Sequence, residues 1–188
     1  MTDEIPREAP DKSSMVVAPS LVLVNTGNGK GKSTAAFGTA IRAVAQGWPV
    51  AVVQFLKSGD WNTGEEKILR DLGVEWHAEG DGFTWDSEDL DESQAHAKGA
   101  WSLAKRLITS GDHRLVVLDE ISYALTWHWI DLDDVVDTIT NRPTKTSVIL
   151  TGRDMVQPIV DIADTVTEMR QIKHAFDKGI VAKKGIDY

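Results

Sequence analysis

The segment LVLVNTGNGKGKSTAAFG, residues 21–38, joins a short apolar run to a glycine-rich turn and then to a stretch of helical character. The turn fits the end of the phosphate-loop pattern G-x-x-x-x-G-K-[ST], with Gly31, Lys32 and Ser33 at the last three fixed positions. The first glycine of the pattern falls on Thr26. In a strand–turn–helix unit, backbone N–H groups and the helix N-terminus converge on one anion. The segment therefore predicts a nucleotide-phosphate site.

The rest of the chain alternates short apolar runs with amphipathic stretches. The first run predicts a strand at residues 21–25, and later runs predict strands at residues 50–56, 74–77, 115–120, 147–152 and 164–172. Residues 80–93 have no period and are expected to form a loop. Helices are expected at residues 65–72, along the stripe Ala97, Ala100, Trp101, Ala104, Leu107 and Ile108, and after Asp131. Strands that alternate with helices predict an α/β fold of the P-loop NTPase-like (RecA-like) class, a mostly parallel sheet with helices on both faces.

The helix after the glycine-rich turn has the clearest pattern. Its apolar positions recur at helical spacing, and Gly47 marks its end. The face that we expect to be buried consists of Ala36, Phe37, Ala40, Ile41, Val44 and Ala45.

The composition limits the classes of function. A chain of 188 residues with 41% hydrophobic and 26% charged residues suits one globular core. A net charge of −9 argues against nucleic acid as a partner, and no apolar run approaches the length of a membrane helix. There is no cysteine, so disulfides and cysteine metal sites are excluded. Residues 1–19 are polar without a secretory pattern and predict a flexible arm, or an arm that closes over a ligand, before a domain at residues 20–188. We expect a cytoplasmic location.

The turn and the helix after it supply the candidate ligands of ATP. Lys32 can reach phosphate oxygens, the Ser33 hydroxyl can bind Mg²⁺, and Lys30 adds a second cation. The candidate nucleotide-binding residues are Gly27, Asn28, Gly29, Lys30, Gly31, Lys32, Ser33 and Thr34. The plain alternative is a glycine-rich turn that binds nothing.

Two adjacent acidic residues are candidates for the second part of the predicted nucleotide site. Asp119 and Glu120 end the apolar run LVVLDE, at the strand edge where open α/β sheets bind ligands. Either could hold Mg²⁺, Glu120 could act as a general base, or an acid here could cap the next helix. Arg153, which follows the next apolar run, could pair with a phosphate or form a surface ion pair.

Two aromatic residues stand in the acidic segment DGFTWDSED. Phe83 and Trp85 could either fill the core or face a flat apolar ligand. From the residues alone the core is the better interpretation, as it is for Trp101, one of seven tryptophans.

The chain resembles the P-loop type of corrinoid adenosyltransferase, also called cob(I)alamin adenosyltransferase. The stretches that carry the resemblance occur in family order over residues 21–188 and are TGNGKGKSTAAFGTAIRAV, VAVVQFLKS, GFTW, VVLDE, TGR, ADTVTEM, IKHAFDKGI and GIDY. Thr26 in place of the first glycine is a feature of this family. Many relatives have threonine at the position of Ser33, and serine keeps the hydroxyl group.

The resemblance implies transfer of the 5′-deoxyadenosyl group of ATP to Co(I) of a corrinoid, which forms adenosylcobalamin or an adenosylated precursor and triphosphate. It implies Mg²⁺ as cofactor, with Glu120 as the leading metal ligand and Asp119 as the second. Lys32 would stabilise the leaving triphosphate. Phe83 and Trp85 would cover the lower corrin face and keep axial ligands away from cobalt.

The resemblance also assigns weaker roles and partners. Arg42 matches a family arginine and is a candidate at the nucleotide, whereas His174 is expected to be structural, because a histidine ligand would hinder cobalt reduction. A homodimer and a flavoprotein reductant are implied as partners. Two other classes of function stay open at this point: an ATPase or small-molecule kinase with Glu120 as base, and a nucleotide switch without turnover.

Overall fold

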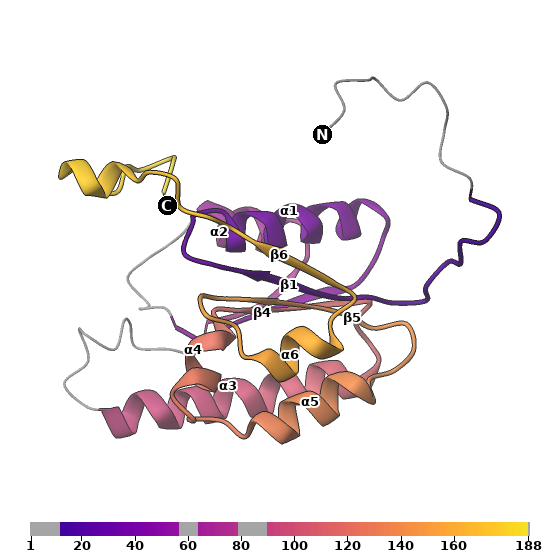
Figure 1. Ribbon diagram of the computed structural model, residues 1–188. Coiled ribbons are helices and arrows are strands. Elements are labelled where there is room, and N and C mark those ends of the chain that lie inside the picture. Colours follow the sequence, from indigo (N-terminus) through magenta and orange to yellow (C-terminus); the bar gives the residue numbers. More distant parts are fainter. Residues whose placement is uncertain (1–11, 57–63, 79–89, 188) are drawn as a thin grey trace.

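A computed structural model describes residues 12–56, 64–78 and 90–187 of the chain (Figure 1). Phe83 and Trp85 lie outside the described residues. In the described part of the predicted arm, residues 12–19, there is no helix or strand, and Met15, Val16 and Val17 are exposed. Among the described helices, none has the length and apolar character needed to cross a membrane.

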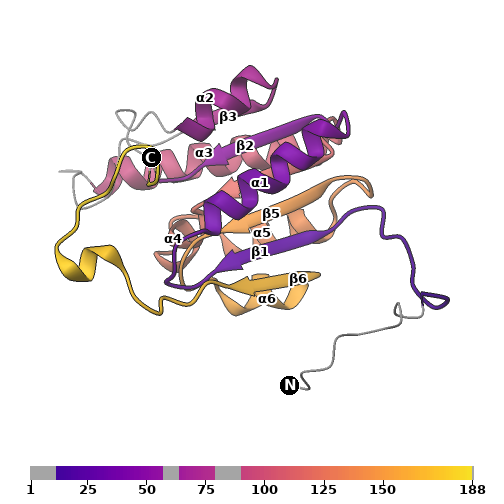
Figure 2. The ribbon, with the colours of Figure 1, turned by 90° about the horizontal axis from the view of Figure 1, so that it is seen from above.

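The predicted parallel sheet is confirmed. Its strands are β1 (Val22–Thr26), β2 (Val50–Gln54), β3 (Glu75–Ala78), β4 (Leu115–Asp119), β5 (Ser147–Thr151) and β6 (Thr165–Glu168). All neighbours pair in parallel, in the order β3-β2-β4-β5-β1-β6, and Figure 2 shows β5, β1 and β6 lying side by side. The last predicted strand is much shorter than residues 164–172 and is an exposed edge. The carboxyl ends of all these strands therefore meet at one edge of the sheet, beside the glycine-rich turn.

Helices cover both faces of the sheet, as predicted. They are α1 (Lys32–Ala45), α2 (Gly64–Asp71), α3 (Leu90–Ser110), α4 (Ile121–Thr126), α5 (Leu132–Thr140), α6 (Gln157–Ile162) and the 3₁₀ helix η1 (Ala175–Lys178). In Figure 1, α1 and α2 lie above the sheet and α3, α4, α5 and α6 lie below it. The start of α3 corrects the expected loop at residues 80–93, which is helical from Leu90 on.

The alternation of side chains along each strand builds two separate cores. Val116 and Leu118 of β4 pack with α3 and α5, whereas Leu115 and Val117 of the same strand pack with α1 and α2. Successive side chains of a strand point to opposite faces, so a strand covered on both faces must be apolar throughout. This requirement explains why β2, β4 and β5 are apolar except at their ends, although they are buried over their whole length.

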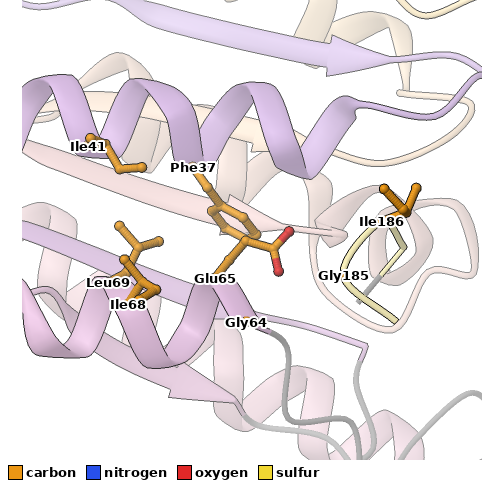
Figure 3. Close-up of a pocket in the computed structure, with 8 residues that line it drawn as sticks. All are labelled: Phe37, Ile41, Gly64, Glu65, Ile68, Leu69, Gly185 and Ile186. Carbon is orange, nitrogen blue, oxygen red and sulfur yellow. The ribbon is translucent and has the colours of Figure 1, made fainter. Parts of the chain in front are cut away.

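The buried face of α1 differs in part from the predicted one. Ala36, Phe37 and Ala40 are buried as expected, with Ala43 as the fourth buried residue. Of the other predicted positions, Val44 is only half-buried and Ala45 is exposed. Ile41 is 46% exposed, because it lies on the side of α1 that turns toward α2 rather than toward the sheet (Figure 3). Phe37 instead packs on Trp76 of β3, with ring centroids 5.1 Å apart.

Candidate functional site

The glycine-rich turn forms a tight loop between β1 and α1. Gly27 and Gly31 have positive φ angles of 91° and 113°, a region that side chains rarely adopt. The loop also packs closely on the backbone that follows β6: the Gly29 N–H donates to the Met169 carbonyl at 2.6 Å. A Cβ atom added at Gly27 would lie 2.6 Å from that same carbonyl oxygen. Backbone packing therefore restricts Gly27, and equally Gly29, whose added Cβ would lie 2.8 Å from the same oxygen, whereas Gly31 is restricted by its φ angle alone.

Thr26 does not need the conformational freedom of glycine. It is the last residue of β1 and is paired with Glu168 of β6. Its carbonyl accepts a hydrogen bond from the Met169 N–H at 2.8 Å, and its hydroxyl accepts one from the Met155 N–H at 3.2 Å. At the position where the common pattern has glycine, β1 thus extends by one residue, and hydrogen bonds to Met155 and Met169 hold that residue on both sides.

The Lys32 side chain folds back over the loop. Its Nζ atom donates to the carbonyl oxygens of Gly27 and Gly29, both at 2.9 Å. Partial burial lowers the pKa of Lys32, and the positive charge of Arg153 lowers it further, although Glu120 and other nearby acids oppose this shift. The ammonium group has neutral partners and a cationic neighbour. Lys32 and Arg153 therefore place two positive charges beside the loop, where a polyanion could bind, with Glu120, Asp119 and Asp154 as neighbouring acids.

Asp119 and Glu120 occupy different environments although they are adjacent in sequence. Asp119, the end of β4, is 3% exposed, and its two carboxylate oxygens accept hydrogen bonds from Thr151 Oγ1 at 2.7 Å and Gln54 Nε2 at 2.9 Å. Glu120 leaves the strand in a left-handed conformation, with φ 62° and ψ 24°. It is the N-cap residue of α4, but its side chain makes no capping hydrogen bond. The geometry therefore does not support the capping alternative for Glu120.

Sequence reasoning missed three residues at this edge. Tyr123, in the first turn of α4, has a raised pKa because of partial burial and the negative charge of Glu120. Gln54 and Thr151 bind Asp119 as described above. A signal was available for Gln54 and Thr151, since each is a polar residue that ends a short, largely apolar strand.

Other predicted positions are distributed as follows. Asn28, Lys30 and Thr34 of the loop are exposed, and Ser33 is half-buried in the first turn of α1. Arg42 is exposed in the last turn of α1, ten residues from Lys32. At 1.5 Å per residue, the two are separated by about 15 Å along the helix axis. The structure does not bring Arg42 to the nucleotide loop within one chain.

His174 has a structural role, as expected. It is the N-cap of η1, where its Nδ1 atom accepts a hydrogen bond from the Phe176 N–H at 3.1 Å. In return, the Asp177 carboxylate accepts the His174 N–H at 3.0 Å. Both groups of this capping box are thus engaged in holding a turn.

The C-terminal segment returns to the nucleotide loop. Asp187 forms an ion pair with Lys30, and its pKa is lowered by the hydrogen bond from the Lys183 N–H and then by Lys30. An open cleft of about 550 Å³ separates the loop from this segment. Its lining comes from Gly29 and Lys30 on one side and from residues 170–176, 180–182, 186 and 187 on the other.

A smaller apolar pocket of about 300 Å³ lies on the far side of the terminal turn (Figure 3). Phe37 and Ile41 of α1 face Ile68 and Leu69 of α2 across it, with Ile186 at its end. Its volume is at the lower limit for small-molecule sites, so it can hold only part of a large ligand.

Comparison with known proteins shows to which family the chain belongs. The family model described as ATP:corrinoid adenosyltransferase BtuR/CobO/CobP matches residues 19–188. Corrinoid adenosyltransferases of Escherichia coli and Salmonella typhimurium are each 45% identical over 168 residues, which is 89% of this chain and 85% of theirs. That of Pseudomonas aeruginosa is 45% identical over 170 residues, which is 89% of this chain and 83% of its own. A solved structure, the flagellar accessory protein FlaH from Methanocaldococcus jannaschii, has a TM-score of 0.48 and 14% identity, covering 80% of this chain and 71% of that one. With its glycine-rich loop, its paired acids and its match over nearly the whole length, the chain belongs to the ATP:corrinoid adenosyltransferase family.

Proposed function

We propose that this protein transfers the 5′-deoxyadenosyl group of Mg-ATP to Co(I) of a corrinoid. The observation that carries the proposal is the position of Lys32, held over the nucleotide loop and close enough to Glu120 and Asp119 for their charges to act on it. Membership of the ATP:corrinoid adenosyltransferase family supports the same reaction. The substrates are ATP and the corrinoid, and we propose a cytoplasmic location for the reaction.

The chemistry assigns the protein a binding and electrostatic role. The cobalt electron pair attacks C5′ of ATP, the C5′–O5′ bond breaks, and triphosphate leaves with the bonding electrons, while Co(I) becomes alkyl-Co(III). Cobalt is the nucleophile, so no side chain needs to be one. Negative charge grows on the triphosphate, and Lys32 with the N–H groups of the loop stabilises it. Gly27, Asn28, Gly29, Lys30, Gly31, Ser33 and Thr34 complete the proposed cradle.

The donor set fits Mg²⁺. The Ser33 hydroxyl and the Glu120 carboxylate would hold the ion, with Asp119 as the second acid beneath. Within the described ranges there is no cluster of three or more His, Asp or Glu side chains suited to a metal. Mg²⁺ in nucleotide sites uses one or two protein oxygens and completes its shell with phosphates and water, so a hydroxyl and an acid suffice. When bound, Mg²⁺ would neutralise charge on the leaving triphosphate.

We further propose that Phe83 and Trp85 cover the lower face of the corrin. Apolar rings there exclude water and offer cobalt no ligand, which makes Co(II) easier to reduce. Trp85→Ala is expected to bind ATP normally and to adenosylate chemically reduced Co(I), but to fail when Co(II) must be reduced on the enzyme. Activity measured in parallel from both starting states tests this. Equal losses in the two assays would contradict ligand exclusion.

The apolar surface of the C-terminal segment supports a homodimer. Ile172, Phe176 and Val181 are 82%, 73% and 79% exposed. Contiguous exposed apolar residues are typical of surfaces that another chain covers. The reaction also consumes Co(I), so an electron donor must act first, and we propose a flavoprotein on the family resemblance. With its net charge of −9, the chain is not expected to bind nucleic acid.

The decisive experiment is anaerobic and uses purified protein, Mg-ATP and chemically reduced cob(I)alamin. The light-sensitive absorbance of the cobalt–carbon product is followed, and the released phosphates are identified. Adenosylcobalamin together with intact triphosphate is the expected result. ADP and phosphate without an alkyl-cobalt product would show an ordinary ATPase instead.

A further inference from the structure

Three adjacent strands end in one buried polar network below the nucleotide site. Gln54 of β2 is in register with Asp119 of β4, and Thr151 is the last residue of β5, on the other side of β4. Their exposed fractions are 2%, 3% and 0%. Buried polar groups at this depth are destabilising unless they are paired. Asp119 accepts a hydrogen bond from each of the other two residues, which gives the network a defined geometry, whereas the Gln54 Oε1 atom has no hydrogen-bond partner among the described residues.

The Thr151 hydroxyl links this network to Glu120. A hydroxyl has one proton to donate, and Thr151 donates it to Asp119 Oδ1. The oxygen is then free to accept, and it accepts the Glu120 N–H at 2.9 Å. Asp119 is thus the group that orients the hydroxyl, and Gln54 is the group that orients Asp119.

Glu120 needs such support because of its backbone. Its φ of 62° is in the left-handed region, which is unfavourable for a residue with a side chain and persists only where the surroundings hold it. The bond to Thr151 fixes the first N–H after β4, where the chain turns into α4. The direction of the Glu120 side chain depends on this turn.

We propose that Thr151 is a positioning residue for the adenosyl transfer: its hydroxyl holds the Glu120 backbone against β5 and so aims the carboxylate at the metal side of the nucleotide loop. The proposal rests on the proposed metal role of Glu120. The amide of Gln54 acts one step further away, through Asp119. Groups that orient a metal ligand in this way typically change metal affinity or activity by about 10- to 100-fold when they are removed.

The test compares Thr151→Val, which keeps the shape and removes the hydroxyl, with Thr151→Ser, which keeps the hydroxyl. Ser147→Ala is the matched control: Ser147 is a buried hydroxyl at the opposite end of the same strand, where it accepts the Leu21 N–H at 3.2 Å. Calorimetric titration of ATP at increasing Mg²⁺ gives the Mg²⁺ concentration for half-maximal binding. Amide hydrogen exchange, resolved at Glu120 by NMR, reports on the turn without any ligand.

For Thr151→Val we expect at least tenfold more Mg²⁺ for half-maximal ATP binding and at least tenfold faster exchange of the Glu120 amide. Thr151→Ser should stay within about threefold of the wild type in both. Ser147→Ala should lower stability and leave both readouts unchanged. Should Thr151→Val not fold, Gln54→Met perturbs the same network from β2 and is expected to shift both readouts in the same direction.

Two results would overturn the proposal. One is a Thr151→Val protein that loses stability like Ser147→Ala yet keeps wild-type Mg²⁺ dependence and wild-type exchange at Glu120. The other is a Thr151→Ser protein as impaired as Thr151→Val. A wild-type protein that binds ATP equally with and without Mg²⁺ would contradict the proposed metal role of Glu120. Thr151 would then have no role in the reaction, even if its substitution changes amide exchange at Glu120.

Discussion

Alanine substitutions at four glycines separate two physical reasons for glycine in this chain. Gly27 has both a positive φ of 91° and no room for a Cβ, which would lie 2.6 Å from the Met169 carbonyl oxygen. Gly29 has only the steric restriction, at 2.8 Å from the same oxygen. Gly47 has only the positive φ, 70°, with nothing within 4 Å. Gly38, inside α1, has neither restriction.

The expected loss of stability follows from adding the two terms. A left-handed residue with a side chain is destabilising by about 1–2 kcal/mol, and an overpacked side chain by about 1–3 kcal/mol. Gly27→Ala should therefore lose about 2–5 kcal/mol, Gly29→Ala about 1–3 and Gly47→Ala about 1–2. Gly38→Ala should gain about 0.5–1 kcal/mol, because alanine loses less entropy in a helix than glycine does.

Urea denaturation of the four variants and the wild type measures these differences, and thermal midpoints should move by about 2–4 °C per kcal/mol for a domain of this size. Met169 presents backbone atoms to the loop, so a small side-chain rearrangement cannot relieve the contact. If Gly29→Ala is as stable as the wild type, or Gly27→Ala loses no more than Gly47→Ala, the loop is not packed on Met169 as described, and its glycines serve the phosphates alone.

Three further variants test other parts of the molecule. Lys32→Ala should lose adenosyl transfer while keeping its unfolding midpoint, because removal of a partly buried charge offsets the loss of its two hydrogen bonds to the loop; turnover at the wild-type rate would contradict the phosphate role. Hydrogen bonds from Lys105 and then Trp101 lower the pKa of Asp134, so its ionised form stabilises the folded state. This contribution is complete above the ordinary aspartate pKa of about 3.9 and is lost as the pH falls through the lower pKa of the folded state. Asp134→Asn should thus cost about 0.5–1 kcal/mol at pH 6, since the pair is partly exposed, and the difference should shrink in denaturation curves below pH 4. Deletion of residues 1–18 should leave stability and ATP affinity unchanged in calorimetry, because the described part of this arm is exposed; a lower melting temperature would place the domain boundary earlier.

The sheet could be predicted from sequence because its central strands are covered on both faces. Such strands are apolar over most of their length. No helical pattern fits the segments Val50–Gln54 and Leu115–Asp119 equally well, so they are predicted as strands. The phosphate loop was predictable for a related reason, since its pattern combines several independent requirements in nine residues. The edge strand β6 was less predictable, because all four of its residues are exposed and its length is set by pairing with β1 alone.

The network around Asp119 could not be predicted, because it depends on strand order. In sequence, β3 separates β2 from β4, yet in the sheet β2 lies directly beside β4. Only this order brings Gln54, from 65 residues earlier, to the Asp119 carboxylate. Tyr123 was missed for a different reason: a tyrosine in the first turn of a short helix looks like part of the core until the left-handed turn at Glu120 sets the direction of that helix.

The packing of the nucleotide loop on Met169 joins the two ends of the domain. β1 and the loop come from its beginning, whereas β6 and Met169 come about 140 residues later, and hydrogen bonds from Gly29 to Met169 and from Met169 to Thr26 connect them. The same C-terminal segment returns to pair Asp187 with Lys30 of the loop. A phosphate loop held only by its own strand and helix could open freely. In this chain the loop is held between the segment after β5 and the segment after β6, the last strand in sequence, so its shape depends on residues from the C-terminal part of the domain. Changes in the C-terminal segment are therefore expected to act on ATP binding even where they do not touch the nucleotide.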